Sequence, residues 1–274
     1  MPRRYEPPGG HHDRSGNPLF DADEALRQVD ICFVMDATGS MSSYIDATRK
    51  ELKAFASKLA THSMKPKMAY GLVLYRDHPP EDSSFVTNLS PLSENLEQTQ
   101  QALNRASAEG GGDGPEAVVD GIYDAVYRMQ WRKGSHKVIL LAGDAPPHGE
   151  GASGDGFSRG CPCGHNVQTV AQEAREKGIT IFCLGIGNDR DMQRTFQQIA
   201  KNSGGQYVPL ASAGTLINNV LTITMGEFGK VDIDRVVMAA YSSSATPASI
   251  ARATGLNITD VTASIDRLKR KELI

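Results

Sequence analysis

Three oxygen-bearing side chains, Asp36, Thr38 and Ser40, alternate with other residues in one short segment of the chain. The segment follows a run of apolar residues, and Gly39 within it permits a tight loop. Alternation presents the carboxylate and the two hydroxyl groups toward one point. Oxygen ligands of this kind suit Mg²⁺, Mn²⁺ or Ca²⁺ and not zinc. The segment therefore predicts a site for a hard divalent cation.

Two further segments supply carboxylates. Asp144 follows an apolar run, and Asp113 lies in a glycine-rich loop at residues 109–117 that leads into a helix beginning near Pro115. Each segment alone could be helix capping, with Ser40 or Asp113 as the cap. Three carboxylates at one sheet edge would repel one another without a cation, so their coincidence favours a metal. The predicted metal-binding residues are Asp36, Thr38, Ser40, Asp113 and Asp144.

The elements that position these side chains can be predicted from apolar periodicity. Strand-length apolar runs alternate with helical patterns, which indicates a parallel sheet covered by helices on both faces. The predicted fold is a doubly wound, mainly parallel α/β domain over residues 25–228, and ligands of such sheets bind outside the carboxyl ends of the strands. The predicted strands are residues 29–36, 68–75, 84–89, 136–142, 179–186 and 206–210, and the predicted helices are 42–59, 95–107, 116–129, 167–177 and 192–202.

The three segments resemble the metal-ion-dependent adhesion site of von Willebrand factor type A domains. The resemblance rests on Asp-x-Thr-x-Ser at residues 36–40, on Gly-Gly-Gly-Asp at residues 110–113 and on Asp144. It implies the Rossmann-like fold of that family and a role in binding a protein partner. It also implies that Thr38 and Ser40 bind the ion directly, whereas Asp36 and Asp144 act mostly through water.

A branch of this family found beside alpha-type protein kinases and in bacterial proteins is more similar still. The similarity is carried by Tyr75-Arg76-Asp77-His78, by residues 112–116 and by residues 144–149. No kinase domain is recognisable, so kinase activity is not implied. Where the family usually has Thr in the third loop, this chain has Asp113, whose charge would neutralise more of the ion's charge. We therefore expect weaker attraction for an acidic partner residue than in integrin-like relatives.

The loops around the predicted site should face the partner. We expect the partner to approach loops 76–82, 110–116 and 145–165, and Asp77 is either an outer carboxylate of the ion or part of a salt bridge. The tight Cys-x-Cys spacing argues against a zinc site built from Cys161, Cys163 and His165, together with His148. The expected alternative is that residues 149–164 form a lid loop over the metal site, with exposed or half-buried thiols. The predicted partner-facing residues are Arg76, Asp77, His148, Cys161 and Cys163.

Residues 229–274 change in character and predict a small all-α, helix-turn-helix module similar to winged-helix regulators. In such a motif a small residue lets the two helices approach, a glycine permits the turn and an apolar residue packs between the helices. Ala251, Gly255 and Val261 are spaced for these roles, and Asn257 can cap the second helix. Arg267, Lys269 and Arg270 would contact DNA. The segment has little net positive charge for binding phosphates, however, so protein docking is an equal alternative.

Composition limits the remaining classes. The 274 residues have a net charge of −3, which argues against a polyanion-coating protein, and no apolar run is long enough to span a bilayer. The N-terminus lacks the apolar segment of a secretory signal, and residues 1–24 predict a flexible arm. Four cysteines are too few for a disulfide scaffold. We therefore expect a cytoplasmic protein.

Three functions are compatible with these features. The first is a non-enzymatic, Mg²⁺- or Mn²⁺-dependent (or Ca²⁺-dependent) protein-binding module, acting as a scaffold or adaptor in a bacterial multi-protein system. The second is a transcription regulator that binds DNA through its C-terminal helices. The third is a metal-dependent hydrolase with its ion held by Asp36 and Asp144.

Overall fold

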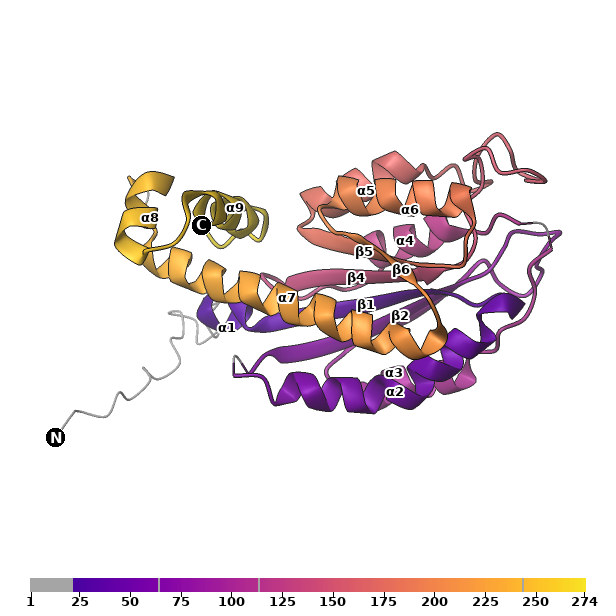
Figure 1. Cartoon of the computed structure of the whole chain (residues 1–274), viewed down its shortest axis with the longest axis horizontal. Helices are drawn as coiled ribbons and strands as arrows, with labels where there is room; N and C mark the ends of the chain where they lie inside the picture. Colours follow the sequence, from indigo (N-terminus) through magenta and orange to yellow (C-terminus); the bar gives the residue numbers. More distant parts are fainter. Residues whose placement is uncertain (1–21, 64, 113, 243) are drawn as a thin grey trace, which may run out of the picture.

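The computed structural model describes residues 22–63, 65–112, 114–242 and 244–274. Its centre is one six-stranded sheet with the strand order β3-β2-β1-β4-β5-β6 (Figure 1). All neighbouring strands are parallel except β3, which runs antiparallel to β2. The strands are β1 (Gln28–Asp36), β2 (Lys67–Tyr75), β3 (Thr87–Ser93), β4 (His136–Gly143), β5 (Ile179–Ile186) and β6 (Tyr207–Leu210). The predicted doubly wound, mainly parallel α/β fold is confirmed.

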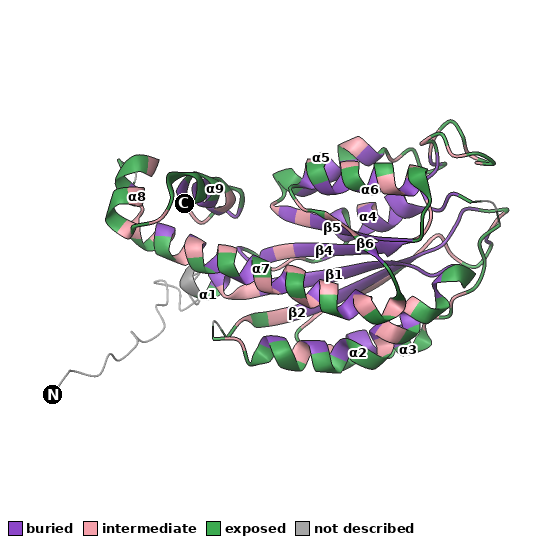
Figure 2. Cartoon of the chain, in the orientation of Figure 1, coloured by how far each residue is buried: buried purple, intermediate pink, exposed green. Residues whose placement is uncertain are grey.

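Helices cover both faces of this sheet (Figure 1). On one face lie α2 (Ser42–Ala60), α3 (Leu96–Arg105) and α7 (Ala213–Ala240). On the other lie α4 (Val118–Tyr127), α5 (Val167–Glu176) and α6 (Arg190–Ser203). Strand β1 contributes to both layers, because Phe33 and Met35 pack with the first group of helices and Cys32 and Val34 with the second. Burial on both faces explains why β1 is a continuous apolar run (Figure 2).

The edge strand β3 lies three to four residues beyond its predicted position of 84–89. Its residues are half-buried or exposed, so the segment has no continuous apolar run to mark it. Pro91 lies within it, which is compatible with an edge because proline cannot donate a hydrogen bond to a neighbouring strand.

Helix α7 corrects the predicted boundary between residues 228 and 229. The helix continues from Ala213 to Ala240 without interruption. Val220, Phe228 and Val231 pack against the sheet, and Val237 packs in a separate cluster with the C-terminal helices. Because the apolar face of α7 simply changes partners, no linker is needed between the two parts.

The N-terminal boundary also changes. Residues 22–26 form the short helix α1 (Ala22–Leu26), and fully buried Leu26 belongs to the C-terminal apolar cluster. Residues 22–24 of the predicted arm are therefore helical, and residues 1–21 lie outside the described part of the chain.

Two short helices follow α7 at the end of the sheet where β4 begins (Figure 1). They are α8 (Pro247–Thr254) and α9 (Ile258–Arg270). Thr246 and Ser249 form a capping box at α8, Gly255 adopts φ 73° after it, and Asn257 accepts a hydrogen bond from the backbone N–H of Thr259. Within the described residues, no helix has both the length and the apolarity to cross a membrane.

Candidate metal centre

The first segment is held together by hydrogen bonds around Asp36. Asp36 Oδ1 accepts from the backbone N–H of Thr38 at 2.8 Å and from its hydroxyl at 2.6 Å. The Thr38 hydroxyl oxygen lies 3.4 Å from that of Ser40. Asp36 and Thr38 are buried, whereas Ser40 is exposed. The structure thus brings the three oxygen-bearing side chains to one point, with one of them open to solvent.

The second oxygen of Asp36 identifies where a cation would fit. Asp36 Oδ2 is buried and has no hydrogen-bond partner. Burial, together with the nearby Asp144 carboxylate, raises the pKa of Asp36 to about 7 despite the hydrogen bonds from Thr38, which lower it. A cation at Oδ2 would satisfy this oxygen and favour the ionised form. The donors here are all oxygen, so the site fits a hard divalent ion.

Asp144 and Tyr75 lie close to the Asp36 carboxylate. Asp144 directly follows β4 and is half-buried. The hydroxyl group of Tyr75 is buried without a hydrogen-bond partner, and its pKa lies well above the usual value because of burial and the carboxylates of Asp36, Asp144 and Glu116. Gly143 is required here because a Cβ atom would lie 2.3 Å from the Tyr75 hydroxyl oxygen.

The glycine-rich loop lies alongside the first segment. The backbone N–H of Gly39 donates to the Gly110 carbonyl at 3.3 Å, and that of Glu109 donates to the Ala37 carbonyl at 3.1 Å. A Cβ atom at Gly111, where φ is +86°, would lie 3.1 Å from Glu116 Oε1 and 3.3 Å from Thr38 Cβ. The loop therefore reaches the site as predicted, although Asp113 itself lies outside the described residues.

Glu116 is the site residue that the sequence did not reveal. It is buried, it neighbours Thr38 across Gly111, and its backbone N–H donates to the Pro146 carbonyl at 2.9 Å. This bond joins the glycine-rich loop to the segment after Asp144. The available signal was an acidic residue directly after Pro115, at the start of a helix.

Four of the five residues predicted to face a partner are buried instead: Arg76, Asp77, His148 and Cys161. Arg76 donates to the Ser84 hydroxyl at 2.7 Å and to the Ser107 carbonyl at 2.8 Å, and its guanidinium lies 4.6 Å from the centre of the Phe85 ring. Its interactions fix the loop after β2. The structure thus corrects the prediction: these four side chains support the loops, and Cys163 is the one exposed member of the set.

His148 holds the lid loop to the rest of the site. Its Nε2 lies 2.6 Å from Asp77 Oδ1, and its Nδ1 lies 2.9 Å from Asp155 Oδ1. Burial alone would lower the pKa of His148, but the hydrogen bonds that its ring donates to the two carboxylates raise it above the usual value. The imidazolium form is therefore favoured between two acids.

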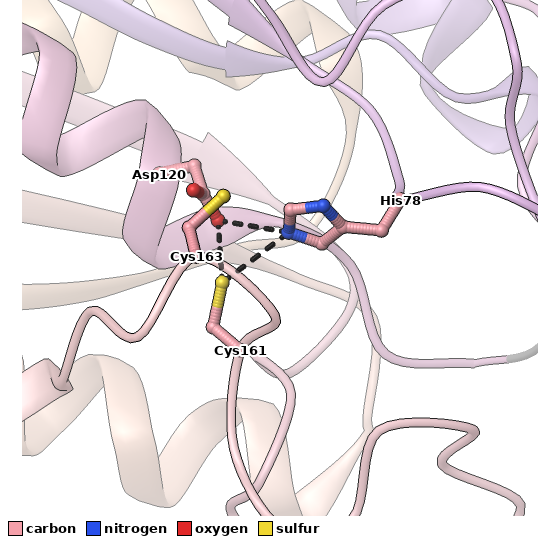
Figure 3. Close-up of side chains that lie close together, drawn as sticks. All are labelled: His78, Asp120, Cys161 and Cys163. Atoms are coloured by element: carbon pink, nitrogen blue, oxygen red, sulfur yellow. Dashed lines mark hydrogen bonds and ion pairs between the residues drawn. The ribbon is translucent and has the colours of Figure 1, made fainter.

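A second cluster consists of His78, Asp120, Cys161 and Cys163 (Figure 3). His78 Nε2 lies 3.1 Å from Asp120 Oδ2 and 3.2 Å from Cys161 Sγ, and the Cys161 thiol donates to Asp120 Oδ2 at 2.8 Å. Cys163 joins them, and partial desolvation together with the Asp120 carboxylate raises its pKa to about 11. His165 is not a member, because its ring stacks on Tyr123 at a centroid distance of 3.7 Å.

The basic residues predicted to contact DNA divide into two groups. Arg267 Nη2 donates to Asp234 Oδ1 of α7 at 2.6 Å, and its Nε donates to the same oxygen at 3.0 Å. Lys269 and Arg270 are exposed. Arg267 therefore fixes α9 to α7, and Lys269 and Arg270 are the exposed members of the predicted DNA-contacting set.

Comparison with known proteins supports the same family. The model of the von Willebrand factor type A domain matches residues 30–223. The alpha-protein kinase vwkA of Dictyostelium discoideum is 29% identical over 165 residues, which are 60% of this chain and 26% of that protein. The putative ariadne-like RING finger protein R811 of Acanthamoeba polyphaga mimivirus is 25% identical over 134 residues, 48% of this chain and 12% of that protein. The chain thus spans about a quarter of the first relative and about an eighth of the second.

Solved structures share the fold at low identity. Proximal thread matrix protein 1 from the mussel byssus, in a structure with a zinc-occupied MIDAS motif, has a TM-score of 0.52 and 15% identity, over 72% of this chain and 46% of that one. The pilus adhesin SpaC of Lactobacillus rhamnosus GG has a TM-score of 0.52 and 16% identity, over 74% of this chain and 30% of that one.

Proposed function

The chain belongs to the von Willebrand factor type A family, and we propose that it is a divalent-metal-dependent module that binds a protein partner at the carboxyl edge of its sheet. The observation that carries the proposal is the buried Asp36 Oδ2, which has no hydrogen-bond partner. The same carboxyl group is bonded to Thr38, whose hydroxyl neighbours that of Ser40, and it is influenced by Asp144. A hard cation here, Mg²⁺ or Mn²⁺ (or Ca²⁺), would turn an unfavourable group of carboxylates into a binding site.

The exposure of the donors supports a role in recognition. Ser40 is exposed and Asp144 is half-buried, so an ion held there faces solvent and has room for a ligand from a partner. Thr38 and Ser40 would bind it directly, with Asp36 and Asp144 acting through water. Glu116 beside Thr38 adds a further carboxylate. This acid lowers the net positive charge of the site, so the partner is held by surrounding loops as well as by the ion.

We further propose that the module is not an enzyme. The two histidines nearest the site are already engaged, His148 by Asp77 and Asp155 and His78 by Asp120 and Cys161. Neither is available as a general base for water at the ion. This arrangement favours binding over hydrolysis.

A cytoplasmic scaffold or adaptor in a bacterial multi-protein system is the setting that we propose. The four cysteines are free, which supports a reducing compartment. The helices α8 and α9 would tether the complex. Because Arg267 is bound to Asp234, docking to protein is favoured over contact with DNA.

The test is metal-dependent stability together with metal-dependent partner capture. After treatment with EDTA, Mg²⁺ at about 100 times its dissociation constant should raise the free energy of unfolding by about 2.7 kcal/mol. Asp36→Ala should lose this gain and should no longer capture partners from a lysate in Mg²⁺. Equal stabilisation and equal capture with the variant would contradict the proposal.

A further inference from the structure

We propose that His78, Asp120, Cys161 and Cys163 form a second metal site, which takes zinc and fastens the lid loop to the body of the domain (Figure 3). The ligand atoms of the four residues all lie within 4.8 Å of one another. They come from three separate parts of the chain: the loop after β2, the first turn of α4 and the loop before α5. The site is independent of the proposed function at Asp36.

The spacing of the ligand atoms suits a tetrahedral ion. Zinc binds sulfur, nitrogen and oxygen at about 2.0–2.3 Å, so tetrahedral ligand atoms lie roughly 3.3–3.8 Å apart. Three of the distances here are 2.8, 3.1 and 3.2 Å, and the remaining ones are at most 4.8 Å. Shifts of less than about 1 Å per side chain would bring all four to the positions that zinc requires.

The donor types select zinc over the ions expected at Asp36. Two sulfurs and one imidazole nitrogen are ligands that zinc favours, whereas Mg²⁺ and Ca²⁺ favour oxygen alone. Asp120 supplies the fourth ligand, which closes the coordination sphere. Closed sites with four protein ligands are structural, and zinc sites that catalyse reactions keep one position open for water.

Surrounding contacts hold His78 and Asp120 in place. The backbone N–H of His78 donates to Asp77 Oδ1 at 2.6 Å, and the same oxygen lies 2.6 Å from His148 Nε2. The His78 ring packs edge-to-face on Phe157 of the lid, with a centroid distance of 5.8 Å. Asp120 lies in the first turn of α4, where the helix dipole favours a negative charge.

The short Cys-x-Cys spacing does not argue against this arrangement. The spacing disfavours zinc only if the remaining ligands belong to the same loop, and His165 of that loop stacks on Tyr123. The remaining ligands come instead from His78 and Asp120. Zinc would thereby join the lid loop to the loop after β2 and to the first turn of α4.

The experiment measures zinc binding by the reduced, full-length protein after removal of bound metal. Titration against a chromophoric zinc chelator should show about one tight site per chain, and Co²⁺ should give sulfur-to-cobalt charge-transfer absorption. Cys161→Ser should weaken zinc binding more than about 100-fold, since even outer contacts of metal ligands contribute 10- to 100-fold. His165→Gln, from the same loop, and Asp36→Ala, from the other site, should both keep the tight site.

Three results would overturn the proposal: no zinc bound by the reduced protein, equal binding by Cys161→Ser, or loss of binding in Asp36→Ala. Because Cys161 is buried, Cys163→Ser provides a second variant at an exposed position, which should fold and should also lose the cobalt absorption. Removal of zinc should speed tryptic cleavage after Arg159, an exposed residue of the lid, whereas an unchanged rate would show that the ion does not hold the loop.

Discussion

Asp36 is a carboxylate whose two oxygens have opposite environments. One oxygen accepts two hydrogen bonds from Thr38, and the other is buried without a partner. A buried polar atom without a hydrogen bond destabilises the folded state until a ligand binds to it, so this oxygen is better suited to binding than to stability. The raised pKa of about 7 has the same cause, namely burial and the neighbouring Asp144.

The substitution Asp36→Asn separates these two roles. The amide keeps an oxygen to accept the hydrogen bonds from Thr38 and removes the buried charge, so in EDTA near pH 8 the variant should be more stable than the wild type by a few kcal/mol. This follows because each unit of pKa shift corresponds to about 1.4 kcal/mol. Added Mg²⁺ should stabilise the wild type and leave the variant unchanged. Thermal melts with and without Mg²⁺ measure both effects, and a variant less stable in EDTA would refute the argument.

At the scale of elements, the backbone of the glycine-rich loop must fit between two neighbouring side chains. Gly111 adopts φ +86° and runs between Thr38 and the Glu116 carboxylate. Gly114 lies in the same loop, and a Cβ atom there would contact nothing within 4 Å. These two glycines therefore make a matched pair for testing the loop.

Gly111→Ala should cost about 1 kcal/mol or more, because a residue with a Cβ atom is strained at this backbone angle. It should also weaken Mg²⁺ binding, since the new methyl group presses on Thr38. Gly114→Ala should change neither property by more than about 0.5 kcal/mol. Urea melts and Mg²⁺ titrations measure the two effects, and equal behaviour of the two variants would count against the described loop geometry.

The first residue of β4, His136, makes stability depend on pH. Its Nε2 lies 2.6 Å from Glu227 of α7, and its Nδ1 lies 3.4 Å from the Lys271 ammonium. Burial and the charge of Lys271 lower the pKa of His136, so the folded protein holds the neutral ring. The same network lowers the pKa of Glu227 to about 2: burial opposes ionisation, but the hydrogen bond from His136 and the ion pair with Lys230 outweigh it.

Stability should therefore fall as the pH is lowered below 6.5, the ordinary pKa of histidine, because the unfolded chain then binds a proton that the folded chain does not. The slope for this one proton is at most about 1.4 kcal/mol per pH unit. His136→Gln keeps a hydrogen-bond donor for Glu227 and should flatten the dependence between about pH 6.5 and 5, whereas His165→Gln should not. Urea melts across this range provide the test, and an unchanged slope in His136→Gln would exclude this residue as the cause.

The sequence predicted the elements best where burial is complete. Strands β1, β4 and β5 are buried on both faces, so their apolar runs located them to within a residue. The half-exposed edge strand β3 gave no such run. Helix α7 was missed as one element, because its buried residues serve two different clusters and do not keep a single periodic face.

Candidate site residues were predictable where they lie next to strand ends. Asp36 is the last residue of β1, Thr38 and Ser40 follow it, and Asp144 follows β4. A parallel sheet brings the ends of these two strands together. His78 and Asp120 could not be assigned to the cysteines, because residues distant along the chain meet only through tertiary packing. Within α4, moreover, Asp120 follows two apolar residues and resembles an ordinary acid in a first helical turn.

At the scale of the molecule, α7 joins the sheet to the C-terminal helices through Asp234. This buried carboxylate accepts hydrogen bonds from Ser264 at 2.7 Å, from Arg267 at 2.6 Å and from Lys271 at 3.3 Å. All three donors lie on or just after α9. The ion pairs and the apolar cluster around Val237 therefore make α7, α8 and α9 one packed unit.

Asp234→Ala should lower the free energy of unfolding by about 3 kcal/mol or more, since it leaves buried cations without their acceptor. Exposed Asp232 lies on the same helix, and Asp232→Ala should change stability by less than about 0.5 kcal/mol. Chemical unfolding with amide hydrogen exchange in α9 would measure the loss and its location. A small effect of Asp234→Ala would show that the apolar cluster alone holds α9.

The central place of β1 in the sheet also determines when the proposed metal centre can form during protein synthesis. Strand β1 is made first, yet one of its two neighbours, β4, carries Asp144 at its end. At about 5–20 residues per second, Asp144 leaves the ribosome roughly 5–20 seconds after Asp36. In that interval β1 can pair with β2 alone, and the nascent chain has the hydroxyl groups of the site without the second carboxylate. Cation binding at the proposed site would thus be a late event of biogenesis, because it requires that the two half-sheets have joined.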